Sequence, residues 1–103
     1  MTGQSTPVMT LVREVNDLLS AASVGLYEFV WMLRSSVPDA TDPELREYAR
    51  HALRDLLDQG MLRLVVLEWP KETELGEVRF ENLDDSAWDD PADGKPYVAL
   101  ARS

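Results

Sequence analysis

The sequence predicts an α+β fold in which three helices are followed by an antiparallel β-hairpin with a long acidic loop between its strands. Three segments of the first sixty residues place apolar side chains three and four positions apart, as one face of a helix requires. Two later segments are short and rich in branched apolar residues, as strands are. The 103 residues can form one hydrophobic core but not two, so we expect a single domain over residues 1–103.

The first helix is predicted to begin at Thr6-Pro7, since Thr is a favoured N-cap and Pro is favoured at the first helical position. Its apolar positions are Val8, Leu11, Val12, Val15, Leu18 and Leu19. A second helix follows Ser23, with Leu26, Phe29, Val30 and Leu33 on one side. Tyr27, Trp31 and Met32 widen that apolar surface, so this helix should lie near the centre of the core. If the three remain exposed instead, they form a patch that favours a homodimer.

The third helix is predicted from its cap as well as its periodicity. Thr41 and Glu44 have the spacing of a capping box, after a polar connection bracketed by Pro38 and Pro43. Gly60 stands where a left-handed residue usually ends a helix. The apolar face between them comprises Leu45, Tyr48, Ala49, Ala52, Leu53, Leu56 and Leu57.

The strands are expected at residues 61–69, ended by Pro70, and at residues 97–101, with residues 78–80 as a candidate third strand. Two strands alone are marginally stable, so they should pair antiparallel and pack on the helices. Residues 70–96 form a long segment without clear periodicity, and segments of that length inside a domain are usually functional or disordered. Four large apolar residues within it favour partial order: Leu75, Phe80, Leu83 and Trp88.

This order of elements, and the passage HALRDLLDQGMLRL at residues 51–64, resembles the winged-helix group of small domains. In that group a helix ends in Leu-Leu-x-x-Gly, here residues 56–60, and the chain turns directly into the first strand of the wing. The resemblance covers residues 24–101 and implies a winged-helix-like fold, with residues 70–96 in the place of the wing. Two features depart from a DNA-binding member. The connection over residues 35–42 exceeds a helix-turn-helix turn, and the wing segment is acidic where Lys or Arg would contact phosphates.

The negative charge is concentrated in the last third of the chain. The formal net charge is −9, and residues 68–103 hold ten acidic and four basic residues against nine and six in residues 1–67. An acidic run surrounds Trp88 without any basic residue; its members are Glu81, Asp84, Asp85, Asp89, Asp90 and Asp93. An aromatic anchor ringed by charge is typical of a protein-binding surface, and acidity attracts a basic partner. The alternative is a solvated loop whose Trp88 folds back over the core.

These features predict a small acidic module that masks a basic partner protein, such as a toxin or nuclease, in the manner of an immunity protein or antitoxin. The alternative is a winged-helix transcriptional regulator that binds DNA through Arg46, Arg50 and Arg54, which share one lane of the third helix. That lane is equally compatible with an ordinary solvated helix face.

Little in the sequence points to catalysis or a bound cofactor. One histidine, His51, and no cysteine cannot form a recognisable zinc cluster, the acidic run lacks the calcium-loop spacing, and the isolated glycines form no nucleotide-binding loop. We expect no enzyme activity, no cofactor and no metal. The N-terminus has no basic stretch before an apolar run, and the longest apolar stretch, residues 61–67, contains Arg63 and falls far short of a membrane span. These features predict a cytoplasmic protein that does not bind membranes.

Overall fold

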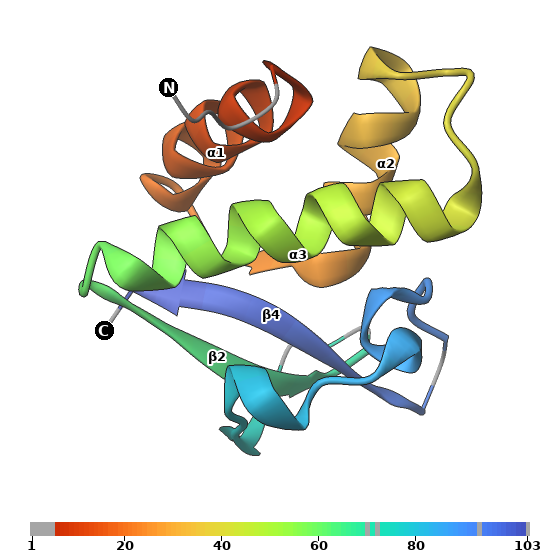
Figure 1. Cartoon of the computed structure of the whole chain (residues 1–103). Coiled ribbons are helices and arrows are strands. Elements are labelled where there is room, and N and C mark those ends of the chain that lie inside the picture. The colour runs from red at the N-terminus through yellow and green to blue at the C-terminus, as the bar shows by residue number, and fades with distance from the viewer. Residues whose placement is uncertain (1–5, 70, 72, 93, 103) are drawn as a thin grey trace.

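The computed structural model describes residues 6–69, 71, 73–92 and 94–102. Its fold is α+β, with three α-helices and a four-stranded antiparallel sheet in the described part of the chain (Figure 1). The helices are α1 (Thr6–Leu19), α2 (Leu26–Ser36) and α3 (Asp42–Asp58). The strands are β1 (Val24–Gly25), β2 (Leu62–Glu68), β3 (Thr73–Glu77) and β4 (Pro96–Arg102), in the order β1-β4-β2-β3.

The ends of α3 confirm the predicted signals. The Thr41 side chain accepts a hydrogen bond from the Glu44 backbone N–H, and the Glu44 carboxylate accepts one from the Thr41 N–H at 2.8 Å. This reciprocal capping box satisfies two backbone donors that the helix itself leaves unpaired. Gly60 has φ of +83°, a left-handed conformation that strains other residues, and it lets the chain turn from α3 into β2.

The two main strands lie where the sequence predicts them. β2 and β4 pair antiparallel from Leu62 opposite Arg102 to Glu68 opposite Pro96. The prediction of a third strand at residues 78–80 was wrong, because β3 covers residues 73–77 and Phe80 begins a 3-10 helix, η1 (Phe80–Asn82). A second 3-10 helix, η2 (Asp85–Trp88), follows, so residues 70–96 hold more regular structure than a long loop. β1 was not predicted, since a two-residue strand carries no alternation.

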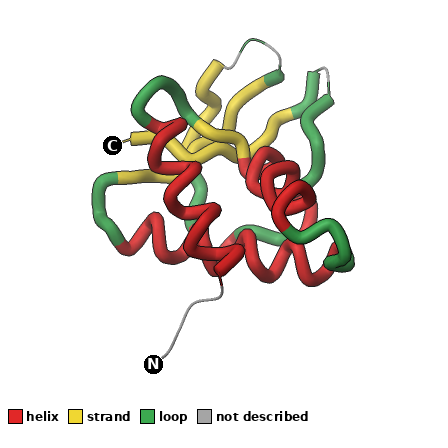
Figure 2. Tube along the Cα trace, turned by 90° about the horizontal axis from the view of Figure 1, so that it is seen from above, coloured by secondary structure: helices red, strands yellow, loops and turns green. Residues whose placement is uncertain are grey.

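The main core lies between the helices and one face of the sheet (Figure 1). Side chains alternate along β2 and β4, so Leu64 and Leu100 join this core while Val65 and Ala99 point to the other face. In the view from the helical side, the strands extend beyond the helices at one end (Figure 2). The helices of the described part lack the length and apolarity needed to cross a membrane.

The outer face of the sheet carries a second apolar cluster. Val65, Leu67, Tyr97 and Ala99 are buried there together with Tyr27 from the start of α2, and Trp69 and Ala101 pack against them. At the edge of this face, Arg63 of β2 pairs with Glu74 at 3.0 Å and with Glu77 at 3.3 Å, both from β3. The hydrogen bond from Arg63 lowers the pKa of Glu74, so the ion pair fastens the edge strand to its neighbour.

Candidate protein-binding site and the arginine row

The acidic run, residues 81–93, is anchored by apolar side chains that turn inward. Trp88 is 4% exposed and its ring lies 6.1 Å from that of Phe29 on α2, while Leu83 is also buried. The structure therefore places the Trp88 indole in the core, as the alternative of a tryptophan folded back over the core describes. A partner that binds this segment can meet its carboxylates but not the buried indole ring.

Hydrogen bonds inside the run define its shape. Asp84 is the N-cap of η2 and accepts hydrogen bonds from the Ser86 hydroxyl and the Ser86 backbone N–H. These two bonds hold the pKa of the Asp84 carboxyl below its ordinary value. Asp84 therefore stays ionised and serves the local fold as well as the surface charge.

The other predicted carboxylates are exposed and lie in different surroundings. Asp85 forms an ion pair with Arg46 of α3 at 3.7 Å. Asp90 accepts a hydrogen bond from the Trp31 indole Nε1–H at 2.9 Å. Asp89 makes no ion pair or side-chain hydrogen bond with any residue that the structure describes, and Asp93 lies outside the described residues. Asp89 and Asp90 line a hollow of about 280 Å³ between α2, α3 and η2, which Arg34 and Arg46 also line.

Trp31 is a functional candidate that the sequence placed in a homodimer patch with Tyr27 and Met32, and not among the partner-binding residues of the acidic run. Its side chain is 49% exposed, whereas Tyr27 is buried and Met32 packs against the main core. The predicted exposed patch of Tyr27, Trp31 and Met32 is thus reduced to one residue. The signal for this lies in the neighbours of Trp31 on the helix surface, since Glu28 and Ser35 at three and four positions away are polar.

The exposed indole is held from two sides. The Tyr27 ring meets it edge-on at a centroid distance of 4.9 Å, and Asp90 fixes its Nε1–H. Tyr27 in turn makes edge-on contacts with Trp69 at 6.3 Å and Tyr97 at 5.7 Å. We call Trp31 with Asp89 and Asp90 the Trp31 face. The ring of this surface is fixed by Tyr27 and Asp90, and little side-chain entropy of Trp31 remains to be lost when a partner binds it.

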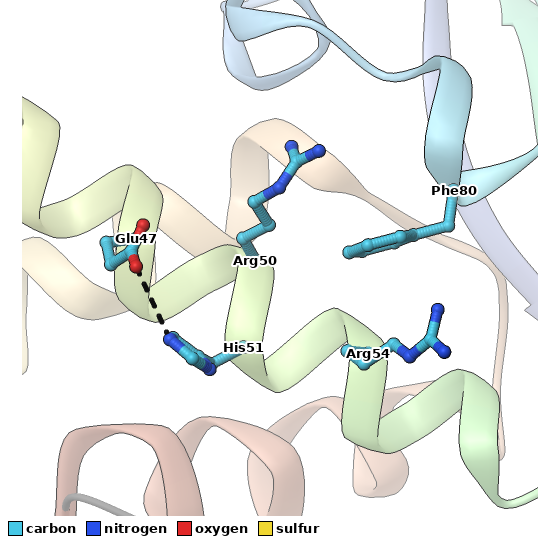
Figure 3. A pocket seen from close by; sticks show the side chains of 5 residues that line it. All are labelled: Glu47, Arg50, His51, Arg54 and Phe80. Carbon is cyan, nitrogen blue, oxygen red and sulfur yellow. Dashed lines mark ion pairs between the residues drawn. The ribbon is translucent and has the colours of Figure 1, made fainter.

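The arginine row, Arg46, Arg50 and Arg54, runs along α3 as predicted, but the acidic run lies against it. Arg46 pairs with Asp85, and Arg54 pairs with Asp58 on its own helix at 3.6 Å. The guanidinium groups of Arg50 and Arg54 lie 4.9 and 5.4 Å from the centre of the Phe80 ring (Figure 3). The row is therefore partly neutralised and partly stacked, and is not a free cationic lane.

His51 lies on the exposed side of α3, with its Nε2 3.4 Å from a Glu47 carboxylate oxygen. Both side chains are about two-thirds exposed. Within the residues that the structure describes, no three metal-ligating side chains gather in one place. The pair is an ordinary surface contact one helical turn long, and it does not form a recognisable catalytic arrangement.

Comparison with known proteins adds no relative: no protein-family model matches the sequence, and no match was found among curated proteins or solved structures.

Proposed function

We propose that this protein is a small protein-binding module whose Trp31 face binds a basic partner protein, as an immunity protein or antitoxin masks a toxin or nuclease. The observation that carries the proposal is the half-exposed indole of Trp31, fixed by Asp90, whose chain neighbour Asp89 has an exposed carboxylate without an ion pair to any described residue. Exposed tryptophans dominate binding energy at many interfaces. A carboxylate beside the ring adds attraction for Lys or Arg, which also interact favourably with the indole face.

The charge of the whole chain supports the same partner chemistry. A net charge of −9 favours encounter with a basic surface and opposes encounter with nucleic acid. The acidic run contributes five exposed carboxylates among the described residues: Glu81, Asp84, Asp85, Asp89 and Asp90. The Trp31 ring provides the affinity of the contact, and the carboxylates raise its association rate and its selectivity.

The test combines capture, rescue and affinity. Tagged protein is incubated with an extract of its native host, captured proteins are identified, and each basic candidate is purified for calorimetry. We expect one basic protein to bind, Trp31→Ala to weaken that binding by about 30-fold or more, and co-expression to relieve any toxicity of the partner. Recovery of no basic protein, or equal affinity for Trp31→Ala and the wild type, would contradict the proposal.

The second candidate function is a winged-helix transcriptional regulator that uses the arginine row. The element order favours it, as does the guanidinium of Arg50, which has no ion pair with a described residue, while the ion pair of Arg46 with Asp85 counts against it. This candidate predicts DNA binding at low salt that weakens steeply as salt rises and is impaired by Arg50→Ala. An absence of mobility shift at low salt would exclude it.

A further inference from the structure

A cleft of about 360 Å³ lies between α3 and η1, away from the Trp31 face. Its lining residues are Glu47, Arg50, His51, Arg54 and Phe80 (Figure 3). The cleft exists because the chain leaves β3 early and begins η1 at Phe80, whose ring then projects toward the helix. Four side chains of one helix and one ring from a distant segment thus face a common space.

The Phe80 ring holds two guanidinium groups in place. Figure 3 shows Arg50 and Arg54 extending on either side of the ring, while Glu47 and His51 pair with each other along the helix. Stacking on a ring uses the flat face of a guanidinium and leaves its N–H edge free to donate hydrogen bonds. Phe80 therefore orients the donors without consuming them.

Among the described residues, the ion pairs of the arginine row leave one guanidinium, that of Arg50, without a carboxylate partner. Within the arginine row, Arg46 pairs with Asp85 and Arg54 with Asp58, whereas Arg50 has no ion pair with any carboxylate that the structure describes. The acidic residue of the lining, Glu47, lies 3.4 Å from the ring nitrogen of His51 and forms no ion pair with Arg50 in the described part of the chain. Arg50 is half-buried, so its charge is partly desolvated and gains more from an anion than a fully exposed arginine would.

We propose that this cleft binds a single oxyanion, a carboxylate or a phosphate group, with Arg50 as the principal donor and Arg54 as the second. The planar N–H edge of a guanidinium matches two oxygens of either group. A polyanion fits less well, because Asp84 and Asp85 line the adjoining hollow beside Arg46 and Arg50 and repel further negative charge. The site does not depend on the partner proposed for the Trp31 face.

The experiment follows the arginine Nε–H and backbone amide signals of the whole chain by NMR while sodium phosphate or sodium acetate is added at constant ionic strength. We expect saturable shifts at Arg50, Arg54 and Phe80. Arg50→Gln should weaken binding by about tenfold or more, since it removes a charge-assisted pair of hydrogen bonds. Phe80→Leu should weaken it several-fold by releasing both guanidinium groups. Arg13→Gln, at an exposed arginine of α1, removes the same charge elsewhere and should change nothing.

The order of affinities separates the sources of the anion. Tighter binding of phosphate than of acetate indicates a phosphate site, and tighter binding of acetate indicates a site for an acidic side chain. Either result supports the proposal. Shifts that do not saturate, or that persist in Arg50→Gln, would overturn it. A DNA duplex that displaces phosphate and binds across all three arginines of the row would also overturn it, in favour of a nucleic-acid surface.

Discussion

Gly25 shows how one missing methyl group shapes the outer face of the sheet. It is buried in β1, and a Cβ atom added there would overlap the ring of Tyr27. Its backbone angles, φ −66° and ψ 145°, are open to any residue, so only the ring requires a glycine. We predict that Gly25→Ala costs about 1–3 kcal/mol of unfolding free energy through overpacking, measured by urea denaturation.

A double-mutant cycle isolates that clash. In a Tyr27→Ala background the space is free, so the added methyl group of Gly25→Ala should cost little. An unchanged cost in both backgrounds would show that backbone conformation, and not the ring, requires glycine at this position.

The two tryptophans of α2 and η2 are predicted to have opposite roles. Trp88→Ala leaves a cavity in the core beside Phe29 and should lower the unfolding free energy by about 3–5 kcal/mol. Trp31→Ala removes a half-exposed ring and one exposed hydrogen bond, and should cost about 1 kcal/mol. Urea denaturation of both variants checks this, and equal losses would contradict the assignment of Trp31 to binding.

Trp31 and Trp88 also show which feature of the site the sequence does not predict. An acidic run around an aromatic residue is visible in the sequence, but whether the ring points in or out depends on the space that α2 leaves for it. Trp88 fills that space beside Phe29, and the exposed ring is that of Trp31, which lies 57 residues away in the sequence and is hydrogen-bonded to Asp90 of the run. No local pattern contains that contact.

At the scale of elements, features with local causes were predictable. The cap of α3 depends on residues three apart, and Gly60 acts on its own backbone, so both were predicted correctly. β3 depends on pairing with β2 through Arg63, Glu74 and a register shift, which the sequence does not display. β1 is similarly defined only by its partner β4, through Val24 opposite Leu100.

The capping box of α3 makes stability depend on pH. Hydrogen bonds from the Thr41 backbone and hydroxyl lower the pKa of Glu44 in the fold, so the unfolded chain binds this proton more tightly. The contribution is fully present above the ordinary pKa of glutamate and is lost as pH falls through the lowered value. We predict that Glu44→Gln, which keeps the hydrogen bond without the charge, flattens the acid limb of a stability profile measured from about pH 6 to pH 3.

The control for that profile is Glu14→Gln, at an exposed carboxyl of α1 that makes no side-chain hydrogen bond within the described residues. It should leave the acid limb as steep as in the wild type. If both variants flatten the limb equally, the effect belongs to the net charge and not to the capping box.

At the scale of the whole molecule, we expect the rate of association with a partner to depend more on the position of the negative charge than on the net charge. The molecule measures 40 × 28 × 26 Å, and a charge is screened over about 8 Å at physiological salt but about 30 Å at 0.01 M. α1 lies on the opposite side of α3 from the acidic run (Figure 1). Two variants with the same net charge, one at a carboxylate of α1 and one at the Trp31 face, therefore show how the association rate depends on the distance of the charge from that face.

We predict that Asp89→Lys slows association with the proposed basic partner more than Asp17→Lys at physiological salt, because the proposed contact includes Asp89 whereas Asp17 is an exposed residue of α1. At about 0.01 M salt both charges act over most of the molecule, so the two rates should converge. Stopped-flow measurement of the association rate at low and at physiological salt tests both expectations.

Asp89→Lys with Asp90→Lys should slow association further while leaving most of the stability, since both residues are exposed. Equal slowing by Asp17→Lys and Asp89→Lys at every salt concentration would mean that net charge alone directs the encounter, and the partner then binds elsewhere than the Trp31 face.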